Sequence, residues 1–125
     1  MSISLPARPE SVGIARREAA GLGERMGLSR ERIDDLRTVV SEACANAAQH
    51  AYQGGEGAFA LRAVPRRDWI AITVTDQGGG VRPQPASERS SGRLGLLVMA
   101  ALASKFEISA RPSGGTRLSL RFPVD

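Results

Sequence analysis

The chain has 125 residues, of which 42% are hydrophobic and 24% charged, and this ordinary globular composition suits one domain spanning residues 1–125. No apolar run approaches the roughly 20 residues that would span a bilayer, which excludes a membrane-spanning helix. The formal net charge of +4 is nearly all arginine, spread along the chain and interleaved with acids. Because no helix carries a basic stripe, a solvated surface is favoured over nucleic-acid binding, and a contact surface for an acidic protein partner stays open.

Two amphipathic helices are predicted in the first half of the chain. The start, "MSISLPARPE", has no basic-then-apolar signal segment, so a cytoplasmic protein is expected. Ser29 is the expected N-cap of the second helix. Cys44 cannot form an internal disulfide and, among alanines, is interpreted as a small packed residue. Spacings of three and four predict the buried stripes of the two helices: Val12, Ala15, Ala19, Leu22 and Met26, then Ile33, Leu36, Val40, Ala43 and Ala47.

The second half alternates with period two and predicts strands. Two strands are expected around Phe59–Ala63 and over Trp69–Asp76, followed by a long Gly, Pro, Ser and Arg-rich loop over residues 77–93. "LGLLVMAALAS" predicts an apolar third helix, and "KFEISARP" and "TRLSLRF" predict a final hairpin. The last strand has one apolar and one polar face, so helices should cover only one side of the sheet. The predicted fold is an α/β (α+β) two-layer sandwich with a mixed, mostly antiparallel sheet.

Polar side chains follow one stripe of the second helix. Glu42, Asn46 and His50 recur at intervals of four, so they lie on one slowly drifting line and can meet one ligand. At 3.6 residues per turn, Glu42 lies about 140° and Asn46 about 100° from the centre of the buried stripe. They therefore face away from the core or to its side.

These groups and three others suit a nucleotide. Asp76 ends a strand before three glycines, and a carboxylate there can accept a hydrogen bond from the adenine amine. Gly92 and Gly95 open a helix, where backbone N–H groups favour phosphate. An asparagine oxygen suits Mg²⁺, and a nearby glutamate can take a hydroxyl proton. Each feature alone is more often structural, but together they indicate a nucleotide site without a Walker loop.

The boxes "TVVSEACANAAQHAY", "ITVTDQGGGV", "SSGRLGLLVMAALASKFEI" and "GGTRLSLRF" resemble, in this order, those of the GHKL ATPase superfamily. They are most similar to its small bacterial anti-sigma-factor serine kinases, of the sporulation and stress-response switch. The resemblance runs from about Thr38 to Phe122 and implies the Bergerat-type ATP-binding fold.

The resemblance also implies roles for single residues. Glu42 would be the catalytic base and Asn46 the Mg²⁺ ligand, while Asp76 would recognise the adenine base. Thr116 would support that acid through water, and Arg89 or Arg93 would contact the γ-phosphate. The remaining nucleotide-binding positions would be His50, Gly78, Gly80, Gly92, Gly95 and Leu96.

Two departures from the family pattern stand out. Gly79 stands where the family usually has a β-branched residue, so the loop around it should be looser. The alignment of Gly92 with the corresponding family glycine stays open by one position. The lid over residues 81–93 is short, which suits serine kinases better than gyrase-like ATPases. These departures should affect the catalytic rate more than the fold.

The resemblance implies an ATP- and Mg²⁺-dependent protein serine/threonine kinase. It would sequester a sigma factor and phosphorylate an anti-anti-sigma protein of the STAS type, and it suggests a homodimer, with no direct nucleic acid and no membrane. Three alternatives stay open: a non-catalytic ATP-binding module that sequesters a partner, a switch kinase that acts on a scaffold protein without binding a sigma factor, and a sandwich with no nucleotide site.

Overall fold

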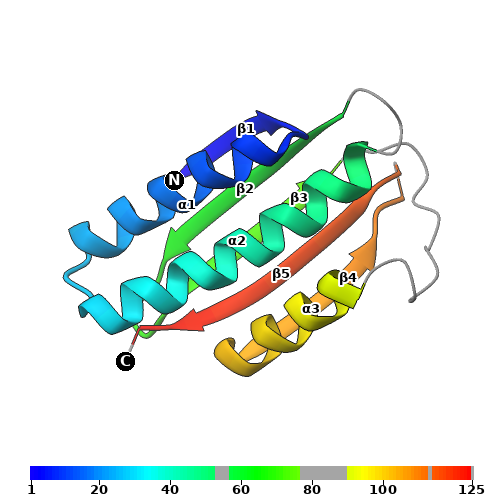
Figure 1. Ribbon diagram of the computed structural model, residues 1–125. Coiled ribbons are helices and arrows are strands. Elements are labelled where there is room, and N and C mark those ends of the chain that lie inside the picture. Colours follow the sequence, from blue (N-terminus) through cyan, green and yellow to red (C-terminus); the bar gives the residue numbers. More distant parts are fainter. Residues whose placement is uncertain (53–56, 77–89, 113, 125) are drawn as a thin grey trace.

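The computed structural model describes residues 1–52, 57–76, 90–112 and 114–124, apart from the side chains of residues 50–52 and 90–93. The elements in chain order are β1 (Ser2–Pro6), α1 (Pro9–Arg25), α2 (Arg30–Tyr52), β2 (Ala58–Pro65), β3 (Trp69–Asp76), α3 (Ser90–Leu102), β4 (Lys105–Ala110) and β5 (Thr116–Pro123). Figure 1 shows α2 running through the middle of the molecule, between α1 and α3.

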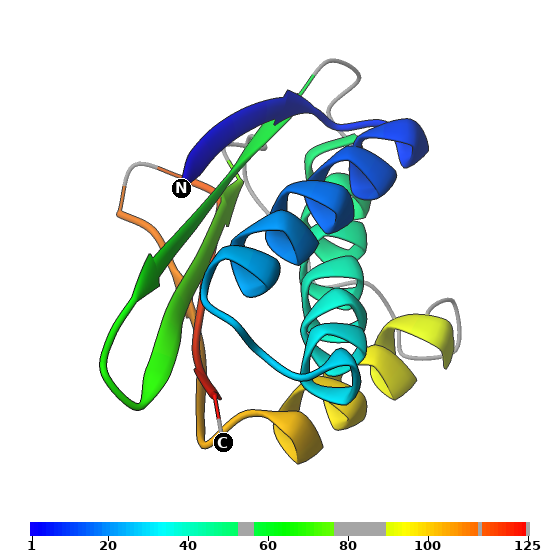
Figure 2. The same ribbon diagram turned by 90° about the vertical axis from the view of Figure 1, so that its left-hand side faces the viewer.

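The strands form one five-stranded sheet in the order β1-β2-β3-β5-β4, and each described pair of neighbours is antiparallel. The three helices of the described residues lie on one side of this sheet, and none of them lies on the other side (Figure 2). The predicted two-layer sandwich with helices on one face is therefore confirmed.

Local chemistry sets where the first two helices begin and end. Pro9 stands at the first position of α1, where its missing N–H costs no hydrogen bond. Gly27, at φ 75°, closes α1: its N–H donates to the Glu24 carbonyl and the Leu28 N–H to the Gly23 carbonyl. The Arg32 N–H then donates to Ser29 Oγ at 3.1 Å, which confirms the predicted N-cap of α2.

The core lies between the helices and the covered face of the sheet. Small residues on α1 and α2, such as Ala15, Ala19 and Ala43, are buried and let the helices approach closely. The inward strand positions supply the larger side chains. Fully buried members of these strands are Phe59, Leu61, Ile70, Ile72 and Phe122.

Two predictions of element boundaries need correction. The sequence analysis predicts no strand before the first helix, but Ser2–Pro6 forms β1 and pairs with β2 as an edge strand, with Ile3 and Leu5 half-buried and Ser2 and Ser4 exposed. The third helix begins at Ser90, earlier than the apolar run from Leu94 predicts. Among the described residues, no helix is both long and apolar enough to cross a membrane.

A matched pair of leucine substitutions tests this distribution of burial. Leu61→Ala should lower the free energy of unfolding by about 2–5 kcal/mol, because it leaves a cavity in a packed core. Leu97→Ala makes the same chemical change on a side chain that is 64% exposed, and should cost less than about 1 kcal/mol. Urea unfolding measures both, and equal losses would contradict the assigned core.

The buried thiol of Cys44 makes stability depend on pH at the alkaline end. Burial raises the pKa of Cys44 from 9.0 to about 12, because the thiolate loses its hydration. The folded protein thus holds a proton that the unfolded chain releases above pH 9.0, so this contribution to stability is lost as pH rises from 9.0 towards about 12. The free energy of unfolding should fall more steeply over this window in the wild type than in Cys44→Ala. Parallel pH profiles would refute the effect.

Candidate functional site

Helix α2 carries the candidate base and the candidate metal ligand. Glu42 and Asn46 are both half-buried, whereas Ala43 and Ala47 on the core side are buried. The two polar side chains therefore flank the core, as the helical spacing predicts. They are one turn apart, so they can face the same ligand.

Helix α3 passes very close to Glu42. A Cβ atom built on Gly95 would overlap Glu42 Oε2 and would lie 3.3 Å from its Cδ. Gly95 is buried in this contact, and α2 and α3 lie side by side in Figure 1. The backbone of α3 thus forms a wall against the Glu42 carboxyl group. The sequence alone assigns Gly95 to phosphate; that role stays a prediction, and the contact with Glu42 is new.

Asp76 ends β3 on the face of the sheet that the helices cover. It is only 2% exposed, and a carboxylate buried this deeply requires hydrogen-bond donors. The Thr116 backbone N–H donates to Asp76 Oδ1 at 3.3 Å. The Arg111 guanidinium donates to the Asp76 backbone carbonyl at 3.2 Å. The turn between β4 and β5 therefore holds Asp76 by both its side chain and its backbone.

Gly115 makes this approach possible. Its φ of +88° favours glycine, and a Cβ there would overlap the Asp76 carbonyl oxygen and lie 2.9 Å from the carbonyl carbon. The Arg111 N–H donates to the Gly115 carbonyl at 3.0 Å and closes the turn. The sequence predicts neither Arg111 nor Gly115 as part of the site. The sequence feature that could have identified this turn is the pair of glycines, Gly114 and Gly115, directly before Thr116.

Thr116 and Leu96 are two further predicted nucleotide-binding residues whose side chains the structure describes. The structure shows the Thr116 backbone N–H, not its hydroxyl, on Asp76, so the water-mediated role of that hydroxyl stays a prediction. Leu96 is half-buried and packs against the core from α3.

Several predicted residues fall outside the described part of the structure. His50, Gly92 and Arg93 lie within the bounds of α2 or α3, but no side-chain description extends to them. The placements of Gly78, Gly79, Gly80 and Arg89 lie outside the described residues, as does most of the predicted lid.

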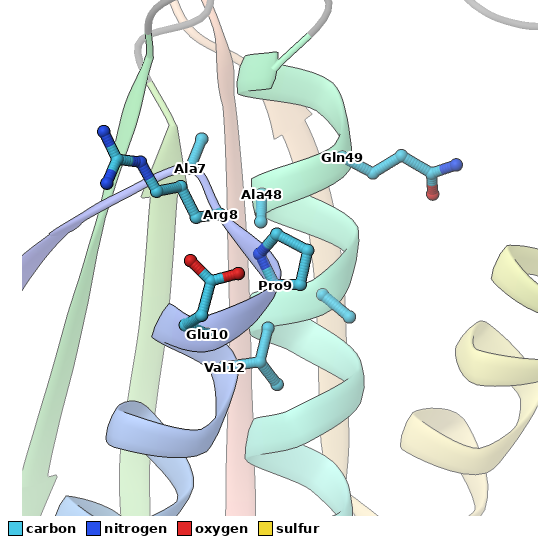
Figure 3. Close-up of a pocket in the computed structure, with 8 residues that line it drawn as sticks. Ala7, Arg8, Pro9, Glu10, Val12, Ala48 and Gln49 are labelled. Atoms are coloured by element: carbon cyan, nitrogen blue, oxygen red, sulfur yellow. The ribbon is translucent and has the colours of Figure 1, made fainter.

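A hollow of about 710 Å³ lies elsewhere, between the start of α1 and the C-terminal half of α2. Apolar groups from Ala7, Pro9, Val12 and Ala48 line it, while Gln49 extends away from it (Figure 3). Neither Glu42, Asn46 nor Asp76 is among its lining residues. The lining of the hollow therefore does not include these described residues of the predicted nucleotide site.

Comparisons with known proteins agree with this arrangement. The chain is 36% identical to "Serine-protein kinase RsbW" of Bacillus pumilus, over 98% of this chain and 85% of that protein. It is 34% identical to the protein of the same name in Bacillus subtilis, over 86% of this chain and 76% of that protein. The crystal structure of the RsbU and RsbW domains of Rv1364c from Mycobacterium tuberculosis shares the fold, with a TM-score of 0.68 at 22% identity, over 98% of this chain and 31% of that one. Residues 5–122 match the histidine kinase-like ATPase domain, and the chain belongs to that family.

Proposed function

We propose that this protein is an ATP-dependent anti-sigma-factor kinase that phosphorylates a serine or threonine of an anti-anti-sigma protein. The main support for this proposal is the contact between Glu42 and Gly95. This contact places the Glu42 carboxylate between α2 and α3, one helical turn from Asn46. The relatives named serine-protein kinase, which match most of the chain, support the same activity.

The residues around Asp76 fit an adenine base. The Asp76 carboxylate sits at a strand end on the covered face, where one oxygen already accepts the Thr116 N–H. A carboxylate has several acceptor sites, so it can also accept from an exocyclic amine. With no side chain at Gly115, the turn packs onto Asp76 and fixes its orientation. Asp76 would thus select adenine by hydrogen bonding.

Asn46 and Glu42 fit the phosphate end of the same nucleotide. Mg²⁺ prefers oxygen ligands and often takes few from protein, so the Asn46 amide oxygen suffices beside phosphate oxygens. When bound, Mg-ATP supplies the phosphoryl group and neutralises part of its charge. Glu42 would orient the acceptor hydroxyl and take its proton. The wall formed by Gly95 keeps the carboxylate from turning towards α3.

The exposed side of α3 supports a protein substrate. Leu94 and Leu97 are 63% and 64% exposed, and exposed large apolar side chains of this kind mark protein contacts. They stand on the helix whose other side contacts Glu42, so a protein that covers them lies close to the base. The anti-anti-sigma protein would occupy this surface. A sigma factor as the second partner implies a cytoplasmic protein, and a homodimer would present two such sites.

Substitution of the two carboxylates separates binding from transfer. Asp76→Asn should weaken Mg-ATP binding at least about tenfold, because the amide presents a donor where adenine needs an acceptor. Glu42→Gln should keep the affinity within about twofold but lower phosphate transfer to the anti-anti-sigma protein by about 10²–10⁴-fold. Titration calorimetry and transfer of labelled phosphate measure the two effects. Transfer at the wild-type rate in Glu42→Gln would exclude this base, and ATP binding without any transfer in the wild type would indicate a non-catalytic module.

A matched pair of glycine substitutions tests the wall against Glu42. Gly95→Ala should lower transfer about tenfold or more, because the added methyl group displaces the carboxylate. Gly13→Ala on α1 places a methyl group 3.7 Å from its nearest neighbour, Arg16. This control should transfer at the wild-type rate and gain about 0.5–1 kcal/mol of stability. Wild-type transfer in Gly95→Ala would show that α3 does not position Glu42.

A further inference from the structure

One side of the sheet has none of the described helices (Figure 2), and the exposed charges on this side are mostly positive. On each strand the side chains that alternate with the buried ones point to this helix-free face. Among the described strand residues, its exposed charged side chains are four basic ones and one acidic one: Arg62, Lys105, Arg117, Arg121 and Glu107. The face thus concentrates most of the chain's positive excess of four charges.

Two of these cations are directly opposed. Lys105 on β4 pairs with Arg121 on β5, and like charges at directly opposite positions destabilise a sheet. Within the described part of the chain, neither side chain has an ion-pair partner. An anion placed between them would remove the repulsion.

A hollow of about 200 Å³ lies at this pair of residues. Its lining includes Thr73 and Ser119, which are paired across β3 and β5 and bring hydroxyl groups beside the two cations. Hydroxyl, ammonium and guanidinium donors together suit a carboxylate. Glu107 also lines the hollow, and its charge disfavours a second anion there. The hollow therefore suits one isolated carboxylate better than a continuous run of phosphates.

The Arg121 guanidinium is already oriented. It lies 4.7 Å from the centroid of the Trp69 ring, and this cation–π contact reduces the entropy that Arg121 would lose on binding. Among the described residues, Trp69 is the only aromatic side chain on the helix-free face. With Arg121 over it, the face lacks the stacking platform that single-stranded nucleic acid requires.

We propose that the helix-free face binds an acidic segment of a protein partner, with one carboxylate in the hollow between Lys105 and Arg121. Arg62 and Arg117 would meet further acidic side chains of the same segment. A second copy of this chain is a poor occupant, because two equal basic faces repel each other. The surface is separate from the nucleotide site, since α2 and α3 lie on the other side of the sheet.

Anisotropy titration with a fluorescein-labelled polyglutamate peptide tests the proposal. The double variant Lys105→Gln/Arg121→Gln should bind about tenfold more weakly than the wild type. The control Arg16→Gln/Arg17→Gln removes the same charge from exposed positions on α1, and should bind within about twofold of the wild type. Circular dichroism confirms that each variant is folded, and Lys105→Gln alone replaces the double variant if that one unfolds.

Three results would overturn the proposal. Equal weakening in both double variants would mean that only net charge matters. Tighter binding of a single-stranded DNA oligonucleotide than of polyglutamate, lost in the same variant, would assign the face to nucleic acid. A wild-type dimer in sedimentation that dissociates on Lys105→Gln/Arg121→Gln would assign it to a second copy of the chain.

Discussion

The burial of α2 is the constraint on which the rest of the structure depends. This helix contacts α1 on one side, α3 on the other, and strands β2, β3 and β5 beneath it. Its core side consists largely of small residues, including Ala43, Cys44 and Ala47, so its neighbours can approach closely. Because α2 also carries Glu42 and Asn46, the packing that stabilises the fold fixes the position of the candidate chemistry.

Both candidate carboxylates are bounded by a backbone that lacks a side chain. Gly95 of α3 faces Glu42, and Gly115 of the β4–β5 turn faces Asp76. In each case a distant part of the chain reaches the acid only because no Cβ intervenes. The site thus gains rigidity from secondary structure and a tight turn rather than from long side chains, whose ordering would cost more entropy.

Much of this arrangement can be predicted from the sequence. Periodicity predicts the helical stripes, alternation predicts the strands around Ile72 and Leu120, and the family resemblance is confirmed by the match over residues 5–122. The short strand β1 escapes prediction because the alternation of Ser2 and Ser4 with Ile3 and Leu5 covers only four residues, the lower limit for predicting a strand. The contacts of Gly95 and Gly115 escape it as well, since local patterns do not encode which distant backbone meets which acid. The roles inferred for Glu42, Asn46 and Asp76 stay predictions.

The composition of α3 has a consequence for how the protein behaves in concentrated solution. From Leu94 to Leu102 the helix has no polar side chain, so its exposed leucines have no charged neighbour within this stretch. Such a surface makes molecules attract one another weakly as their concentration rises. Light scattering of the isolated protein should therefore increase faster than its concentration, and a ligand that covers α3 should raise its solubility.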